Sequence, residues 1–328
     1  GSGSTFSPIF KEGEMTTAIW WIRRDMRLAD NKALQSAARV GDVVPLFVID
    51  PAFVNSGLAR QTFMYDNLRA LDEAMDGALV LKVGDPVVEV LACAREVGAQ
   101  SVHISADFAP YGMRRDIEVE SLLKNADISL VRADSPYCVN PGTVLKDDGT
   151  PLKVFTPFFR RWGSFEVVSA IEAPVTYAQG VAQSAGFPPI QSSSLRLPIA
   201  GEAATWARWE SWSATALSSY KDDRNNPGVD GTSRLSAQLR FGVIHPRQLL
   251  AHLDGSSGAE VFRSELAWRE FYADVLFHNP HTDTEYYAPK FKEMRYDKPG
   301  KQFTAWCEGK TGYPFVDAAM RQLVVEGW

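Results

Sequence analysis

One short stretch, Glu265 to Tyr272, combines residue types that could do chemistry together. In a helix, Glu265, Trp268, Arg269 and Tyr272 fall at positions i, i+3, i+4 and i+7 and share one face. A carboxylate, an indole and a guanidinium on one face suit neither a dry core nor a fully solvated surface. They suit a surface that stacks on a flat molecule and hydrogen-bonds its polar edge. Nucleobases and flavins both have this form, so the stretch predicts a binding site for one or both.

A second candidate lies at Gly231 to Ser236, just before an expected helix. Thr232 and Ser233 follow a glycine, and two hydroxyls at a helix start can present O–H and free backbone N–H groups to a phosphate. An ordinary helix N-cap explains the same residues. The motif by itself leaves both interpretations open.

The remaining motifs give weaker evidence for a functional site. Gly309-Lys310-Thr311 lacks the earlier glycine that a phosphate-binding loop needs, because Thr304 stands there. His278 and His281 have no accompanying carboxylate signature, so we expect no metal. Two arginine groups, at 23–27 and at 160–161 beside Trp162, suit a ligand crevice and a cation–π contact, or solvated salt bridges.

The elements that must position these residues fall into two kinds. From about residue 16 to 132, buried strands are expected at 18–22, 43–49, 79–83, 101–105 and 128–131, with helices at 31–40, 57–75, 85–97 and 111–123 between them. Strands that are apolar on both faces and alternate with helices predict an α/β doubly wound parallel sheet. Ligands of such sheets bind beyond the carboxyl ends of the strands.

The second half has a different pattern. Residues 167–198 are rich in Ser, Ala, Pro, Gly and Gln and indicate a long connector. Helices are expected beyond it at 205–219, 233–240, 246–253, 258–277 and 316–325. We therefore expect a tag or linker at 1–15, an α/β domain at 16–135, an interdomain connector at 136–200 and an all-α domain at 201–328.

Composition narrows the class of protein. With 328 residues, the chain is long enough for two domains. No apolar run approaches a membrane span and no signal peptide is visible, so we expect a cytoplasmic monomer with no membrane partner. The three cysteines are far apart, which fits a reducing compartment. The net charge of −6 argues against nucleic-acid binding by bulk attraction, but it allows arginines to gather in one groove.

Taken together, the chain resembles the photolyase/cryptochrome family, and most of all a class I cyclobutane pyrimidine dimer photolyase. The matching blocks occur in family order: WWIRRDMRLADN at 20–31, FTPFFRRW at 155–162, GTSRLS at 231–236, LRFG at 239–242, ELAWREFY at 265–272 and EGKTGYPFVDAAMRQL at 308–323. The resemblance implies an N-terminal antenna domain followed by a helical FAD-binding domain. Relatives continue beyond residue 328, so we expect the helical domain to be incomplete in this chain.

The resemblance also assigns roles to single positions. The residues implied to contact FAD are Tyr220, Thr232, Ser233, Arg234, Leu235, Ser236, Phe262 and Arg269. The residues implied to contact DNA are Arg224, Glu265, Trp268, Arg269 and Tyr272. Glu265 and Trp268 would act in catalysis at the lesion, and Trp306 would be the outermost member of the tryptophan chain that photoreduces the flavin.

The implied activity is light-dependent repair of cyclobutane pyrimidine dimers flipped out of damaged DNA, with FAD as the electron donor. A nucleoid-associated location would follow in a bacterium. The alternative is a cryptochrome-type photosensor that signals through a protein partner. Relatives that bind a folate antenna often have Glu where Ala109 stands, so a deazaflavin, a folate or no antenna remain open.

Overall fold

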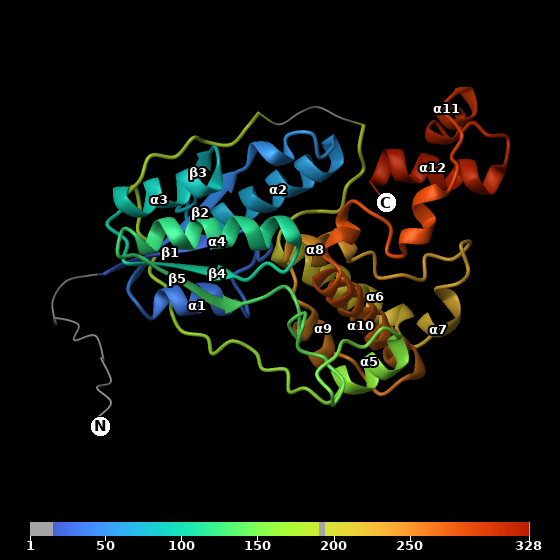
Figure 1. Ribbon diagram of the computed structural model, residues 1–328, viewed down its shortest axis with the longest axis horizontal. Coiled ribbons are helices and arrows are strands. Elements are labelled where there is room, and N and C mark those ends of the chain that lie inside the picture. Colours follow the sequence, from blue (N-terminus) through green and yellow to red (C-terminus); the bar gives the residue numbers. More distant parts are fainter. Residues whose placement is uncertain (1–15, 190–193, 328) are drawn as a thin grey trace.

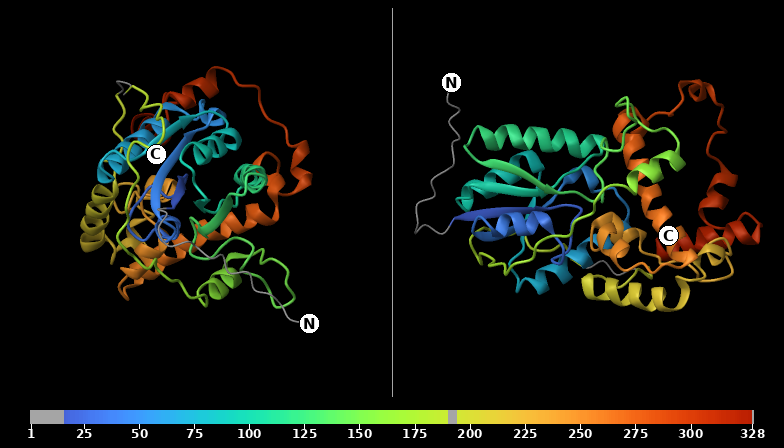
Figure 2. Two further views of the ribbon diagram at one scale, coloured as in Figure 1. Left: turned by 90° about the vertical axis from the view of Figure 1, so that its left-hand side faces the viewer. Right: turned by 90° about the horizontal axis from the view of Figure 1, so that it is seen from below.

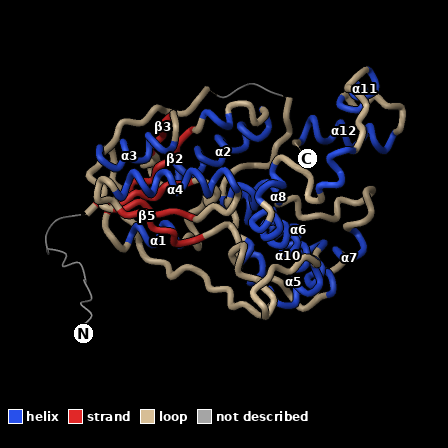
Figure 3. Tube along the Cα trace, in the orientation of Figure 1, coloured by secondary structure: helices blue, strands red, loops and turns tan. Residues whose placement is uncertain are grey.

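The computed structural model describes residues 16–189 and 194–327. The expected tag or linker at 1–15 lies outside these residues. Strands are confined to one half of the molecule and helices fill the other half (Figure 3). The two halves lie side by side along the longest axis (Figure 2).

The first half is a five-stranded parallel sheet in the order β3-β2-β1-β4-β5. All five expected strands are confirmed: β1 (Thr17–Ile22), β2 (Asp42–Ile49), β3 (Val80–Val83), β4 (Ser101–Ser105) and β5 (Ser129–Asp134). The strand order reverses between β1 and β4, which is the point where doubly wound sheets bind ligands.

Helices cover both faces of this sheet, so the predicted α/β doubly wound class is confirmed (Figure 1). α1 (Lys32–Ala38) and α2 (Leu58–Ala74) pack with Trp20 on one face. α3 (Pro86–Glu96) and α4 (Pro110–Lys124) pack with Trp21 on the other. Adjacent tryptophans can face opposite helices because side chains alternate along a strand. A short 3₁₀ helix, η1 (Pro51–Phe53), follows β2.

The second half is all α-helical, also as expected. Its five expected helices are present as α6 (Glu202–Ala216), α8 (Ser236–Phe241), α9 (Pro246–Ala251), α10 (Ser257–His278) and α12 (Pro314–Glu326). The periodicity had not indicated α5 (Phe155–Trp162), α7 (Tyr220–Asp223), α11 (Lys301–Cys307) or the 3₁₀ helices η2 (Pro280–Asp283) and η3 (Pro289–Glu293). These elements have at most eight residues, so each contains little more than two turns of a 3.6-residue repeat and gives only a weak periodic signal. In the described part of the chain, no helix is both long enough and apolar enough to cross a membrane.

The chain that follows α5, up to residue 189, runs along the sheet domain. Thr176 and Ala178 hydrogen-bond on either side of Val43 in β2, and the backbone N–H of Ala185 donates to Leu81 in β3. Tyr177 and Phe187 pack on the same core as α1 and α2. The segment is therefore held along much of its path, unlike a free Gly/Ser linker.

A buried charge cluster joins the two halves. Arg247 of α9 donates to the carboxylate of Asp30 at 2.6 Å and to both carboxylate oxygens of Asp134 at 2.9 Å. Arg27 donates to Asp134 at 3.3 Å and to the carbonyl of Gly242 at 3.3 Å. Burial alone would raise the pKa of Asp134, but hydrogen bonds and charges from Arg247, together with the charge of Arg27, outweigh it and hold that pKa below its usual range.

We predict that Arg247→Met destabilises the protein by about 3–5 kcal/mol at neutral pH, because the buried carboxylate of Asp30 loses its arginine and that of Asp134 keeps only Arg27. A carboxyl with a lowered folded-state pKa stabilises the fold above its unfolded pKa, so the difference from the unmodified protein should shrink below about pH 4. Urea unfolding followed by tryptophan fluorescence at pH 7 and at about pH 3 measures both effects.

The matched control is Arg132→Met, which breaks the exposed pair with Glu120. It should cost less than about 1 kcal/mol. Equal costs for the two variants would refute the importance of the buried cluster.

Candidate functional site

Helix α10 carries the candidate site, and its two sides differ in environment. Ser256 caps its N-terminus by accepting from the backbone N–H of Ala259. One side is buried and includes Phe262, Leu266, Ala267, Glu270 and Phe271. Glu265, Trp268 and Arg269 are half-buried, and Tyr272 is 63% exposed. The expectation that these four residues lie on one helical face is confirmed, since α10 is continuous through them.

Glu265 is paired with an arginine from another element. The guanidinium of Arg224, which follows α7, donates to the Glu265 carboxylate. Each side chain is about one-third exposed, at 30% and 34%. The pair places two of the predicted DNA contacts together at the surface, next to Tyr220, whose ring lies 5.8 Å from the Arg224 guanidinium carbon.

Trp268 lies among aromatic rings. Its ring and that of Phe155 are stacked, with centroids 3.7 Å apart and planes 7° apart. Phe271 meets it edge-on at 5.6 Å, and Tyr272 stacks at 5.6 Å with a tilt of 27°. Trp268 and Tyr272 therefore form a partly open aromatic surface at one side of α10.

Arg269 points toward backbone of other segments. It donates to the carbonyls of Pro136 and Leu239, and its guanidinium lies over the ring of Tyr137. Burial lowers the pKa of Arg269. These contacts tie α10 to α8 and to the chain that follows β5. Its roles toward flavin and DNA stay predictions.

Tyr220 and Phe262 meet in a packed aromatic cluster. Their rings are 5.6 Å apart, and Trp209 and Trp212 lie 5.3 and 5.2 Å from Phe262. Phe262 is 4% exposed and Tyr220 is 8% exposed. Both therefore anchor the helical core at the edge of the predicted flavin region.

The segment from Gly231 to Ser236 is held in place through its backbone carbonyl groups, so its side-chain hydroxyl groups are not needed for this contact. Arg208 donates to the carbonyls of Thr232 and Ser233, and Trp212 donates to the carbonyl of Gly231. A side chain at Gly231 would come within 2.7 Å of Asp223, so this position requires glycine.

The hydroxyls of this segment do not cap the helix that follows. Leu235 is the buried N-cap of α8, which has no side-chain cap. Thr232 and Ser236 are exposed, and Ser233 is half-buried. Arg234 has a left-handed backbone, with φ of 53°, and pairs with Asp230 and Glu326. Hydroxyls and a guanidinium on one segment are a donor set that fits a diphosphate.

Trp306 lies apart from these residues on α11. Its side chain is 45% exposed, and its nearest aromatic contact is Phe303 at 5.8 Å. A surface position is compatible with the predicted outermost place in an electron-transfer chain.

Sequence reasoning missed the role of Glu270. Its buried carboxylate accepts hydrogen bonds from the backbone N–H groups of Cys138 and Val139 and from the indole of Trp162 at 2.6 Å. Burial raises the pKa of Glu270. The only sequence signal was a second acid in the same motif, on the opposite side of the helix from Glu265.

The two arginine groups have structural partners. Arg23 pairs with Asp116 and lies 4.4 Å over the ring of Trp21, so it is no solvated loop residue. Arg161 pairs with Asp147 at 2.6 Å, whereas the indole of Trp162 turns to Glu270. The cation–π contact suggested by their adjacency is therefore replaced by these two interactions.

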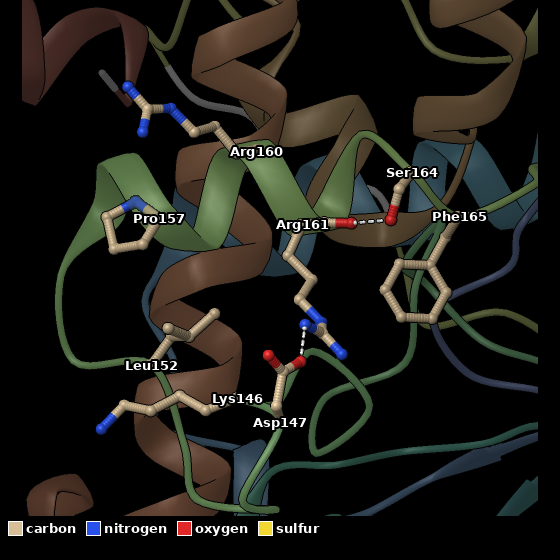
Figure 4. Close-up of a pocket in the computed structure, with 8 residues that line it drawn as sticks. All are labelled: Lys146, Asp147, Leu152, Pro157, Arg160, Arg161, Ser164 and Phe165. Atoms are coloured by element: carbon tan, nitrogen blue, oxygen red, sulfur yellow. Dashed lines mark hydrogen bonds and ion pairs between the residues drawn. The ribbon is translucent and has the colours of Figure 1, made fainter.

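An open hollow of about 610 Å³ lies beside α5. Figure 4 shows Arg161 directed at Asp147 across it, with Ser164 donating to the Arg161 carbonyl. Its remaining lining residues are Lys146, Leu152, Pro157, Arg160 and Phe165. Glu265 and Trp268 do not line it, so it is separate from the candidate site.

Among residues 16–189 and 194–327, no group of three or more His, Cys, Asp and Glu side chains is arranged to hold a metal ion. The three cysteines are free thiols.

Comparison with known proteins places this geometry in a family. Residues 18–175 match the model of DNA photolyase, and residues 262–328 match that of the FAD binding domain of DNA photolyase. The chain is 36% identical to the deoxyribodipyrimidine photo-lyase of Streptomyces griseus, over 96% of this chain and 72% of that protein. It is 34% identical to a deoxyribodipyrimidine photo-lyase of Thermus thermophilus, over 96% of this chain and 73% of that protein.

A solved structure of another protein has the same fold. The bacterial class III photolyase from Agrobacterium tumefaciens superimposes with a TM-score of 0.88 at 28% identity, over 98% of this chain and 71% of that chain. Two matching models, two relatives above 30% identity and the shared architecture lead to one conclusion: the chain belongs to the DNA photolyase family.

Proposed function

We propose that this protein is a deoxyribodipyrimidine photo-lyase that uses FAD and light to repair cyclobutane pyrimidine dimers in DNA. The observation that carries the proposal is the partly open surface of α10, where Glu265 and Trp268 lie next to Arg224 and Tyr272. This surface belongs to the stretch that matches the family's FAD-binding domain.

The segment from Thr232 to Ser236 would hold the FAD diphosphate. Thr232, Ser233 and Ser236 supply hydroxyls, and Arg234 supplies a positive charge. Leu235, Tyr220 and Phe262 would shape the neighbouring apolar wall, and Arg269 would support it from α10. When bound and reduced, FAD would supply the electron that light drives to the dimer.

The lesion would meet the exposed side of α10. A dimer stacks poorly in the duplex, so flipping it out costs less than flipping a normal base. Trp268 would provide a stacking surface bordered by Tyr272, while Arg224 would contact the DNA backbone. Glu265 would hydrogen-bond the pyrimidine edge, and as a proton donor it must first leave Arg224 and take up a proton.

Two further roles belong to the proposal. Trp306 would pass electrons from the surface toward the flavin. An antenna chromophore, a deazaflavin or a folate, would sit in the α/β half, where Ala109 precedes α4 near the carboxyl end of β4. We also propose a monomer. The absorption spectrum of the purified protein and its mass by light scattering address these points.

Blue light should remove pyrimidine dimers from DNA when the FAD-loaded, anaerobically reduced protein is present. The dark sample should remove none, because the electron transfer requires the excited cofactor. Dimers are counted by chromatography of digested DNA. Photoreduction of the flavin without loss of dimers would contradict repair and favour the photosensor alternative.

Trp268→Leu should weaken binding of dimer-containing DNA by about 5- to 150-fold, since a base stacked on an aromatic ring contributes about 1–3 kcal/mol. Binding of undamaged DNA should change little. Trp306→Leu is the matched comparison: it should keep dimer affinity and slow flavin photoreduction. Equal affinity of Trp268→Leu and the unmodified protein for the dimer would remove Trp268 from the lesion site.

Glu265→Gln should lower the quantum yield of repair about tenfold, because an amide cannot supply the charge-assisted hydrogen bond or the proton, a loss of about 1.5 kcal/mol. Glu260→Gln, an exposed change on the same helix, should leave the yield unaltered. The measurement is dimers repaired per photon absorbed at saturating DNA. An unchanged yield for Glu265→Gln rules out the proton-donor role.

A further inference from the structure

The ring of Phe155 covers one face of the Trp268 indole. The centroids are 3.7 Å apart and the planes differ by 7°, so the two rings lie directly over each other. A flat molecule cannot stack on this face of Trp268 unless Phe155 moves. Any base that stacks on Trp268 must therefore use the opposite face.

Phe155 is held in place by its own helix. It begins α5, and Trp162 at the other end of this helix donates to the buried carboxylate of Glu270 on α10. Phe158, between them, is 1% exposed. The helix α5 is thus fixed to α10 at both ends and through its middle.

Neighbouring rings restrict Phe155 further. Phe271 meets it edge-on at 5.9 Å, and Phe159 stacks against it at 5.5 Å with planes 13° apart. Phe155 and Trp268 both pack on the buried core formed by α5, α10 and the residues around Val139. Phe155 is therefore enclosed on several sides and supports the Trp268 ring. It would lose these contacts if it moved away to admit a base.

We propose that Phe155 is a positioning residue for lesion recognition: it fixes the plane of the Trp268 indole and closes one of the two indole faces to the pyrimidine dimer. The proposal rests on the proposed function, in which Trp268 stacks on the lesion. It gives the segment 155–162, which lies in the expected connector, a part in specificity. Tyr272 is also stacked on Trp268, with ring centroids 5.6 Å apart and planes 27° apart, and it is largely exposed, so it would lie beside a dimer bound at the indole.

The first test needs no DNA. Protein labelled with 5-fluorotryptophan should show one ¹⁹F signal that disappears in Trp268→Phe and so belongs to Trp268. Phe155→Leu should shift and broaden this signal, because leucine fills space but offers no flat face. Phe159→Leu is the matched control, since Phe159 stacks on Phe155 and not on Trp268 among the ring pairs of the described residues; it should move the signal much less. An unchanged Trp268 signal in Phe155→Leu would overturn the positioning role, whatever the protein does to DNA.

The second test measures dissociation constants for dimer-containing and undamaged DNA. Phe155→Leu should weaken dimer binding about three- to tenfold, the usual range for loss of one aromatic contact, and leave undamaged DNA unaffected. Phe155→Tyr should restore the affinity because it keeps the ring. Equal losses for both DNAs would mean general damage to the fold and would count against the proposal.

Two other results of these measurements would also test the support role of Phe155. Tighter dimer binding by Phe155→Leu would mean that Phe155 occupies the place of the base, and the support role would be wrong. If the unmodified protein shows no preference for the dimer while the ¹⁹F signal still depends on Phe155, the positioning of Trp268 stands and its proposed use in repair fails.

Discussion

The charged side chains that are buried at the junction of the two halves need oppositely charged partners there. Much of the structure depends on this requirement. Arg247 reaches from α9 to Asp30 and Asp134 in the sheet domain, and Arg27 completes the cluster. An isolated charge in such a place would cost several kcal/mol, so the partners must remain together. The cluster is therefore a fixed point of contact between the helical half and the sheet.

The same constraint arranges the candidate site. Glu270 is buried in α10 and is satisfied by Trp162 of α5 and by backbone N–H groups after β5. Arg269, next to it, is satisfied by carbonyls of Pro136 and Leu239. Helix α10 is thereby fixed by hydrogen bonds to three other segments. A rigid inner side is what allows the outer side to present a defined surface.

The outer side of α10 follows different energetics. Glu265 and Arg224 are partly exposed, so their pair is weak and its members can exchange partners at little cost. Trp268 and Tyr272 leave apolar area open to solvent. Two glutamates five residues apart on one helix therefore differ: Glu270 maintains the architecture, whereas Glu265 is about one-third exposed in a pair that can exchange partners.

The sequence by itself determined the local elements and the class of fold. Runs such as 43–49, apolar on both faces, can be stable only inside a sheet covered on both sides, and the long 3.6-residue pattern at 258–277 can only be a helix with one buried side. It also identified the candidate face of α10, because the spacing of Glu265, Trp268 and Tyr272 is a local property. In contrast, only the tertiary structure decided which residues these side chains contact. Nothing in the sequence near Trp268 indicates Phe155, and nothing near Arg224 or Arg247 indicates Glu265 or Asp134, because these contacts join residues 41 to 113 positions apart that meet only in the folded chain.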